Sequence, residues 1–200
     1  KHALSGACGS LVGISNLGKS ALMRRQCEPS TQNNRSAFVY VDCNAMPERT
    51  AHAFFLALWR ALAEKLQACC EDDSAAARAQ NLNDEIIGAD NATMFTYNFE
   101  RGLALALDHL PHPLVLVFDD FDEAYQALEP QAFLNLRAFK DRYDDALAYV
   151  TATEREFAHL PMSREQGELV ELLAPHGSIF SAVWVALIGL FVRRAAEASY

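Results

Sequence analysis

The sequence predicts an α/β domain built on a central parallel sheet. Apolar, strand-like runs alternate with segments of helical periodicity along most of the 200 residues, and this alternation is typical of parallel sheets covered by helices. Residues 114–118 are continuously apolar, as expected of a strand that is buried on both faces. A glycine-containing loop at residues 13–20 joins the first strand-like run to the first helical one.

Each expected element follows from its local pattern. Alternating or continuous β-branched and apolar residues predict strands, and apolar residues spaced by three or four predict helices. The expected strands are residues 10–12, 37–42, 114–118 and 146–153, and the expected helices are residues 19–27, 50–70, 93–110 and 132–143. The polar stretches at residues 28–36 and 71–83 are expected to be a loop and a surface excursion.

The loop at residues 13–20 fits the pattern G-x-x-x-x-G-K-[ST] at every fixed position. Its glycines let the backbone turn and approach a ligand closely, and its N–H groups together with the helix N-terminus favour an anion. Lys19 can reach the β- and γ-phosphates of a nucleotide, and Ser20 can offer its hydroxyl to Mg²⁺. The predicted nucleotide-binding residues are Gly13, Ile14, Ser15, Asn16, Leu17, Gly18, Lys19, Ser20 and Ala21.

A pair of acids follows the buried strand at residues 114–118. Parallel sheets bind ligands beyond the carboxyl ends of their strands. Asp119 is therefore predicted to hold Mg²⁺ through water, and Asp120 to orient or deprotonate the attacking water. The alternative for the pair is a solvated acidic turn, and Glu123 is expected to be a charge at the start of a helix.

The end of the next strand supplies a third group of candidates. Thr153 can hydrogen-bond the γ-phosphate or the attacking water, and Arg155 can sense the γ-phosphate; the alternative for Arg155 is a surface salt bridge. Asp42 also ends a strand and is expected to be a cap or a supporting residue. Three cations of the helix at residues 132–143 are expected to form a solvated face, with an arginine finger onto a neighbouring subunit as the alternative: Arg137, Lys140 and Arg142.

Composition limits the class of protein. The net charge of −9 argues against a broad nucleic-acid-coating surface. The five cysteines lack C-x-x-C spacing and are expected to be reduced thiols rather than a disulfide or zinc framework. Residues 179–192 are apolar but shorter than the roughly 20 residues that span a bilayer, so a buried strand and core helix are expected there rather than a membrane segment. The chain is expected to be a cytoplasmic piece of a longer protein.

Together, residues 11–20, 38–42, 114–123 and 149–155 resemble the additional-strand branch of the P-loop ATPases. A GTPase is disfavoured because the sequence has no N-K-x-D element. Within that branch the chain resembles the AAA+ and STAND ATPases over about residues 8–160. The resemblance implies a three-layer P-loop NTPase fold with sheet order 5-1-4-3-2. It places an ATPase core at residues 1–175. The last strand and the start of a helical lid follow at residues 176–200.

The resemblance also implies a function. The chain is expected to bind Mg-ATP and to hydrolyse it slowly, because Asp120 stands where glutamate is common. It is expected to act as a nucleotide-dependent switch in a STAND-like signalling protein, with effector or sensor domains outside this chain and a homo-oligomer on ATP binding. The alternatives are a DNA-associated, origin-recognition-like ATPase and a nucleotide-binding module without useful turnover. Direct contact of this domain with nucleic acid or membrane is not expected.

Overall fold

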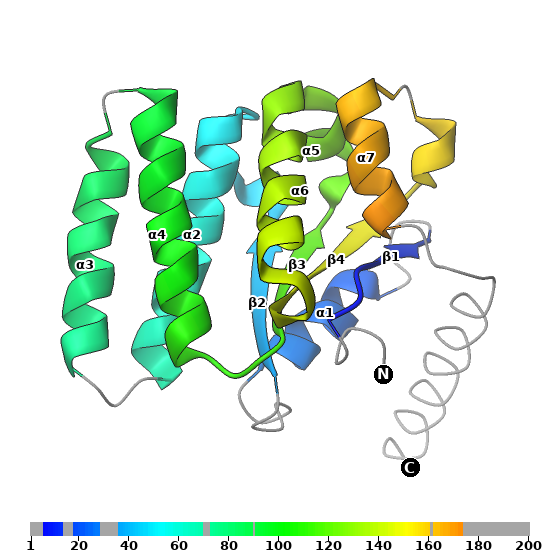
Figure 1. The fold of residues 1–200 in the computed structure, drawn as a ribbon. Coiled ribbons are helices and arrows are strands. Elements are labelled where there is room, and N and C mark those ends of the chain that lie inside the picture. Colours follow the sequence, from blue (N-terminus) through cyan, green and yellow to red (C-terminus); the bar gives the residue numbers. More distant parts are fainter. Residues whose placement is uncertain are drawn as a thin grey trace, which may run out of the picture.

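A computed structural model describes residues 6–13, 18–28, 36–69, 73–89, 91–160 and 162–173. Figure 1 shows a sheet whose strands are separated in the chain by helices. The strands are β1 (Gly9–Val12), β2 (Ala37–Asp42), β3 (Leu114–Asp119) and β4 (Leu147–Thr153). The α-helices are α1 (Lys19–Cys27), α2 (Ala51–Cys69), α3 (Asp73–Ile87), α4 (Ala92–His109), α5 (Phe121–Ala127), α6 (Pro130–Tyr143) and α7 (Arg164–Leu173). Short 3₁₀ turns are η3 (Cys43–Ala45), η4 (Asp144–Ala146) and η5 (Phe157–His159).

The four described strands form one parallel sheet in the order β1-β4-β3-β2. This order is the 1-4-3-2 part of the order expected from the sequence, and it matches the core of a P-loop NTPase. The register pairs Asp42 with Asp119 and Val12 with Thr153. The polar strand ends therefore meet at one edge of the sheet. The last strand and the start of the lid helix expected at residues 176–200 lie outside the described residues, as does the whole apolar segment at residues 179–192.

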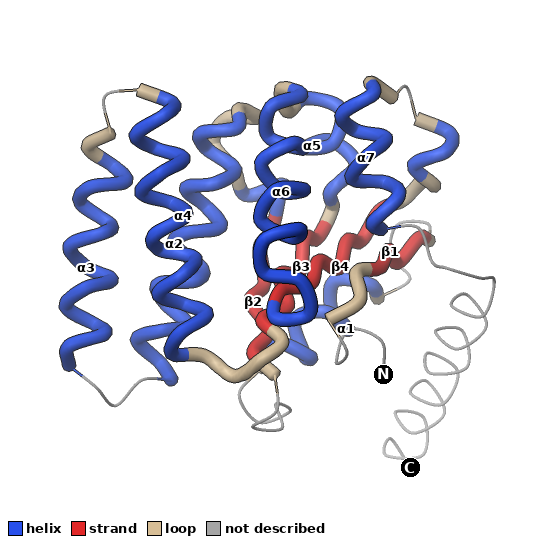
Figure 2. Tube along the Cα trace, viewed as in Figure 1, coloured by secondary structure: helices blue, strands red, loops and turns tan. Residues whose placement is uncertain are grey.

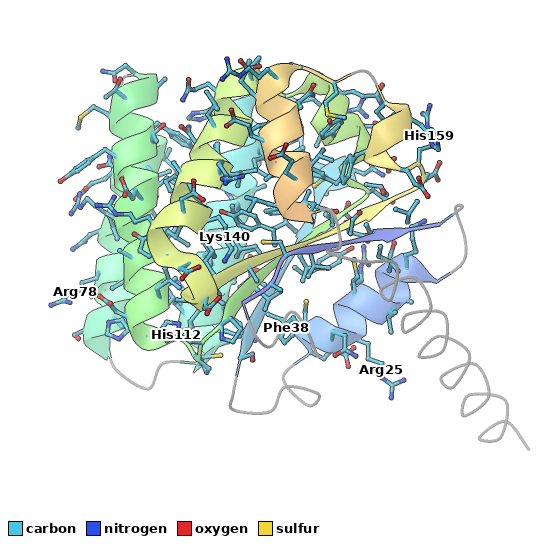
Figure 3. All side chains as sticks on the ribbon, turned by 45° about the vertical axis from the view of Figure 1, so that its right-hand side comes forward. Arg25, Phe38, Arg78, His112, Lys140 and His159 are labelled. Atoms are coloured by element: carbon cyan, nitrogen blue, oxygen red, sulfur yellow. The ribbon has the colours of Figure 1, made fainter. Side chains whose placement is uncertain are left out.

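Helices cover both faces of the sheet (Figure 2). The larger core packs helices α2, α4, α5, α6 and α7 against one face, through Leu114, Leu116 and Phe118 of β3. On the other face, Met23 of α1 packs against Val115 and Val117. Figure 3 shows Phe38 and Arg25 on this α1 side and Lys140 on the opposite side. The alternating contacts of β3 confirm that this strand is buried on both faces, as its apolar run predicts.

The expectation of a surface excursion at residues 71–83 was wrong, because most of this stretch belongs to α3. Small and apolar residues recur at helical spacing and bury one face of α3: Ala75, Ala79, Leu82 and Ile86. Helix α3 packs against α2 and α4 at one end of the molecule (Figure 1). The polar residues that suggested a surface excursion are the solvated face of this helix.

Two further sequence expectations concern composition. Cys8, Cys27, Cys43 and Cys69, the four cysteines that the structure describes, are free, and their expected reduced state stays a prediction. Burial raises the pKa of the Cys43 thiol further than the nearby carboxylates do, so this thiol stays protonated and unreactive. In the described part of the chain, no helix has both the length and the apolar character needed to cross a membrane.

Candidate nucleotide site

The ends of the glycine-containing loop hold the first strand and the first helix together. The N–H of Gly13 donates to the carbonyl of Thr153 on β4 at 3.1 Å, and Lys19 Nζ donates to the carbonyl of Gly13 at 2.5 Å. Gly18 has a φ of +80°, a backbone conformation that residues with a Cβ rarely adopt. The structure therefore explains the glycine at position 18 and closes the loop through Lys19. Residues 14–17 between these ends lie outside the described part.

The two acids after β3 have different environments. Asp119 is buried, whereas Asp120 is partly exposed and adopts φ of +50° and ψ of +46°. This left-handed conformation costs a non-glycine residue about 1 kcal/mol, and such strain often accompanies a functional role. The N–H of Asp120 donates to Asp119 Oδ1 at 3.1 Å. The turn thus presents two carboxylates side by side at the edge of the sheet.

A tyrosine and an arginine hold the buried acid from the side. Tyr40 on β2 donates its hydroxyl proton to Asp119 Oδ2 at 2.6 Å, a length typical of a charge-assisted bond. Arg24 of α1 donates from Nε to the Tyr40 hydroxyl at 2.9 Å and from Nη2 to Asp42 Oδ2 at 3.1 Å. Burial and the bond to Asp119 raise the pKa of Tyr40. The phenol therefore remains protonated and keeps donating.

An asparagine completes the link between the strand ends. The Asn44 side chain donates from Nδ2 to Asp120 Oδ2 at 3.0 Å, and its backbone N–H donates to Asp42 Oδ1 at 3.0 Å. Burial and the charges of Asp119 and Asp42 raise the pKa of Asp120, while Lys19 and Asn44 lower it in part. Lys19 and Asp120 therefore interact electrostatically at the same edge of the sheet. A raised pKa suits a group that accepts a proton near neutral pH.

The end of β4 lies against the acidic turn. Thr153 is fully buried, and its hydroxyl has no hydrogen-bond partner within the described chain. Arg155 is exposed, but its backbone N–H donates to Asp122 Oδ1 at 3.2 Å, and that of Glu154 donates to Asp122 Oδ2 at 2.8 Å. A buried hydroxyl without a partner among the described residues is expected to bond a group that the structure does not show, such as an ordered water molecule. Asp122 holds the adjoining loop.

The remaining charged candidates have structural partners. Glu123 at the start of α5 pairs with Arg49, and Arg142 pairs with Glu100. Arg137 bonds Asp141 and the carbonyl of Glu168. Lys140 is buried and donates to the carbonyl of Asp144 at 2.5 Å, so the expectation of a wholly solvated face was wrong for this residue.

The donor set at the sheet edge fits Mg²⁺ as the sequence predicts it. Mg²⁺ prefers hard oxygen ligands and is usually bound by one or two protein groups, with phosphates and water completing the octahedron. Ser20 on α1 and Asp119 on β3 supply a hydroxyl and a carboxylate. Among the described residues no three His, Cys, Asp or Glu side chains gather as a ready-made metal cage. Ser20 and Asp119 therefore remain the residues predicted to hold a nucleotide-bound Mg²⁺.

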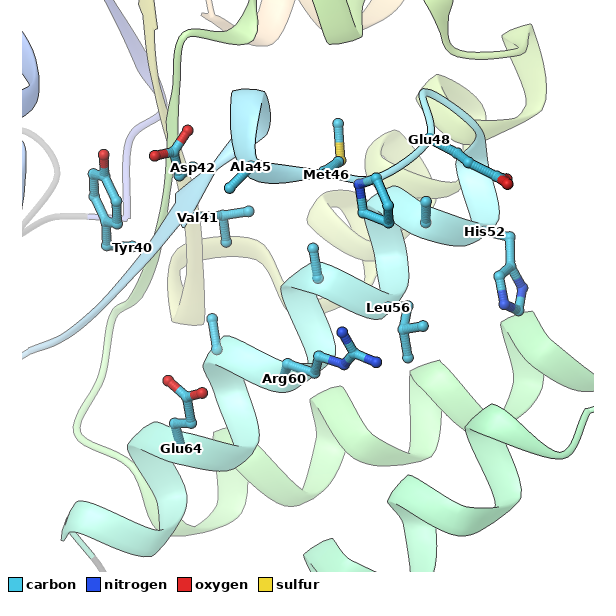
Figure 4. Close-up of a pocket in the computed structure, with 14 residues that line it drawn as sticks. Tyr40, Val41, Asp42, Ala45, Met46, Glu48, His52, Leu56, Arg60 and Glu64 are labelled. Atoms are coloured by element: carbon cyan, nitrogen blue, oxygen red, sulfur yellow. The ribbon is translucent and has the colours of Figure 1, made fainter.

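A cavity of 490 Å³ lies beside this site, between β2, residues 45–48 and α2 (Figure 4). Tyr40 and Asp42 border it at the sheet, and Leu56, Arg60 and Glu64 line the helix. None of the described residues of the phosphate loop or of the acidic turn lines it. It therefore adjoins the predicted phosphate site without being part of it.

Three supporting residues were missed in the sequence: Arg24, Tyr40 and Asn44. Arg24 lies four positions after Ser20, on the same face of α1, and Tyr40 shares a strand face with Asp42. These spacings were the signals in the sequence that could have placed Arg24 beside Ser20 and Tyr40 beside Asp42. Their partners, however, come from other elements, so only the sheet order shows which residues meet.

No family model matches the sequence, and no curated protein matches it significantly. Several solved structures are similar to the chain. Two of them are Cdc6p from Pyrobaculum aerophilum, with TM-score 0.44 and 17% identity, and Orc1 from Aeropyrum pernix in complex with DNA, with TM-score 0.47 and 16% identity. Each alignment covers 82% of this chain and 37% of the other, so the chain spans little more than a third of those proteins. These TM-scores are too low to carry an argument, and the fold class rests on the sheet order.

Proposed function

We propose that this chain is an ATPase domain that binds Mg-ATP, hydrolyses it slowly and changes conformation with the state of the nucleotide. The observation that carries the proposal is the sheet order, which brings Lys19 at the end of the phosphate loop and Asp119 at the end of β3 to the same end of the sheet. These residues come from two motifs about a hundred positions apart, and their proximity is what a phosphate site between them requires.

The residues have separate roles in this proposal. Lys19 and the loop amides bind the phosphates, while Ser20 and Asp119 hold the metal ion. Asp120 orients the attacking water and accepts its proton, assisted by its raised pKa. Thr153 and Arg155 respond to the γ-phosphate. When bound, Mg²⁺ neutralises charge that develops on the phosphates.

Binding and turnover are tested separately. In the first test the protein is titrated with a fluorescent ATP analogue, once in the presence of Mg²⁺ and once in the presence of EDTA. Wild type should bind more tightly with Mg²⁺, and Lys19→Met should lose most of its affinity. Lys65→Met on α2 is the matched lysine control and should bind like wild type. A wild-type protein without Mg²⁺-dependent affinity for any nucleotide would overturn the proposal. Competition between ATP and GTP then identifies the base.

In the second test phosphate release is measured for wild type and Asp120→Asn. General bases typically contribute 10²–10⁴-fold, so a loss of at least about 10-fold is expected from a slow enzyme. Equal rates would remove Asp120 as the base. No turnover by wild type despite tight binding would leave a nucleotide-binding module.

The role of the domain in a larger protein is a separate question. The sequence resemblance favoured a STAND-like signalling switch and left a DNA-associated, origin-recognition-like ATPase as the alternative, and the similar structures include Orc1 in complex with DNA. Their likeness to this chain is too low to decide substrate or partner. Fluorescence anisotropy with duplex DNA, with and without Mg-ATP, decides between the roles, because only a DNA-associated ATPase should bind the duplex.

A further inference from the structure

The side chains around Asp119 and Asp120 form a closed chain of hydrogen bonds. These hydrogen bonds run from Asp119 through Tyr40 to Arg24 and Asp42, and return through Asn44 to Asp120. The N–H of Asp120 bonds Asp119 and closes the ring. Three elements contribute to this ring of hydrogen bonds: the first helix, the edge strand β2 with its following turn, and the end of β3.

The direction of the tyrosine bond is determined by its neighbours. The Tyr40 oxygen accepts from Arg24 Nε at 2.9 Å, so its own proton is directed elsewhere. Asp119 Oδ2 lies 2.6 Å away and can only accept when ionised. Arg24 thereby aims the hydroxyl of Tyr40 at Asp119.

Both oxygens of Asp119 are consequently held. Oδ2 accepts from the Tyr40 hydroxyl, and Oδ1 accepts from the N–H of Asp120. Two bonds on different oxygens fix the plane of the carboxylate. Each oxygen still has a second lone pair that can accept a further partner. The fixed plane of the carboxylate sets the direction of this lone pair.

Stability alone gives a weak reason for this arrangement. The side chain of Arg24 is 59% exposed and that of Asp42 is 30% exposed, and ion pairs this exposed contribute about 0–1 kcal/mol. Arg24 instead lies one helical turn after Ser20, on the same face of α1. Through Tyr40, Arg24 therefore connects the helix that begins at the phosphate loop to Asp119, the acid predicted to hold the metal.

We propose that Tyr40, oriented by Arg24, is a positioning residue that holds the Asp119 carboxylate in the orientation used for nucleotide-bound Mg²⁺. This inference rests on the proposed function. Supporting hydrogen bonds of this kind typically change metal affinity 10–100-fold when removed. Tyr40 contributes no atom to the metal ion and acts only through Asp119.

The test measures the Mg²⁺ dependence of nucleotide binding by the whole chain. A fluorescent ATP analogue is bound at increasing Mg²⁺ and, separately, in EDTA. Tyr40→Phe keeps the ring and removes the hydroxyl, and should raise the half-saturating Mg²⁺ concentration about 10-fold while leaving affinity in EDTA unchanged. Tyr143→Phe, on the half-buried tyrosine that ends α6, is the matched control and should behave like wild type.

Arg24→Lys tests whether the arginine acts through the tyrosine. It keeps the positive charge but loses the planar fork that bonds Tyr40 and Asp42 together. Its effect on half-saturating Mg²⁺ should be no larger than that of Tyr40→Phe. The double variant should be no worse than Tyr40→Phe alone, because residues acting in series are not additive.

The outcomes separate this inference from the proposed function. If wild type shows no Mg²⁺-dependent affinity, the proposed function fails. If wild type shows it and Tyr40→Phe matches Tyr143→Phe, the function stands and the positioning role is overturned. Equal weakening of binding in Mg²⁺ and in EDTA, with a lowered Tm, would also overturn it, because that is the signature of a merely structural residue.

Discussion

Asp122 and Glu154, 32 positions apart in the chain, are joined by a hydrogen bond of 2.8 Å from the backbone N–H of Glu154 to the carboxylate of Asp122. The other carboxylate oxygen accepts the N–H of Arg155 at 3.2 Å. Asp122 is buried in the first turn of α5. One side chain thus fixes the loop after β4 to the turn that carries the paired acids.

We expect Asp122→Ala to destabilise the fold by about 1.5–3 kcal/mol, the usual range for hydrogen bonds to a charged group. Two backbone donors lose their acceptor in this variant. Asp122→Asn should recover part of the loss, because its single oxygen can accept one of them. Urea unfolding measures the free energy of unfolding of both variants. Asp141→Asn is the control, since its carboxylate is exposed and pairs within one helix; it should change stability by no more than about 0.5 kcal/mol. A loss in Asp122→Ala as small as the control's would contradict this role.

The second prediction concerns Asp120, whose pKa is raised by burial and by its acidic neighbours. The folded state then binds more protons than the unfolded state, so stability falls as pH rises through the raised pKa. At pH 7 the ionised carboxylate therefore destabilises the fold. Asp120→Asn should raise Tm at pH 7 while lowering phosphate release. Asparagine also tolerates the left-handed backbone at this position.

Thermal unfolding between pH 4.5 and 8 measures this effect. The difference in Tm between Asp120→Asn and wild type should shrink toward the acid end, where the carboxylate of the folded state begins to be protonated. A lower Tm for Asp120→Asn at pH 7 would refute the electrostatic argument.

The third prediction concerns Asn44, whose side-chain N–H bond to Asp120 lowers the pKa of that carboxyl. Asn44→Ala removes the bond, so the pKa of Asp120 should rise further. The acid limb of the pH–rate profile for phosphate release should then move to higher pH. Asn135→Ala is the control, because Asn135 bonds only Gln131 on the exposed surface of α6 among the described contacts. An unchanged acid limb in Asn44→Ala would separate Asn44 from the titration of Asp120.

Local sequence pattern predicts most of the sheet because each strand has its own signature. Residues 37–42 alternate between the two faces of β2, and residues 114–118 form the core of β3. The role of the paired acids Asp119 and Asp120 could be proposed from the sequence because they come at the end of that apolar run. Helix α3 was missed for the opposite reason. Its buried face uses Ala75 and Ala79, which give too little hydrophobic contrast against a polar background.

The supporting residues of the site could not be predicted from spacing alone. Tyr40 and Asp119 are 79 positions apart and meet because β2 and β3 are neighbours in the sheet. The bond from Asn44 to Asp120 depends on the turn after β2 in the same way. Sequence identifies which residues can do chemistry. The order and register of the strands decide which of them hold the others in place.

The last prediction compares two helical glycines. A Cβ at Gly102 in α4 would lie 2.4 Å from the buried ring of Trp59, whereas a Cβ at Gly167 in α7 would lie 3.4 Å from Met162 Sδ, an ordinary contact. Alanine gains up to about 1 kcal/mol over glycine in a helix, but crowding a packed core costs about 1–3 kcal/mol. Gly102→Ala should therefore be destabilised by about 1–2 kcal/mol in urea unfolding, while Gly167→Ala should be unchanged or stabilised. Equal stability of the two variants would show that α2 and α4 can move apart, and that Gly102 is not needed for their close approach.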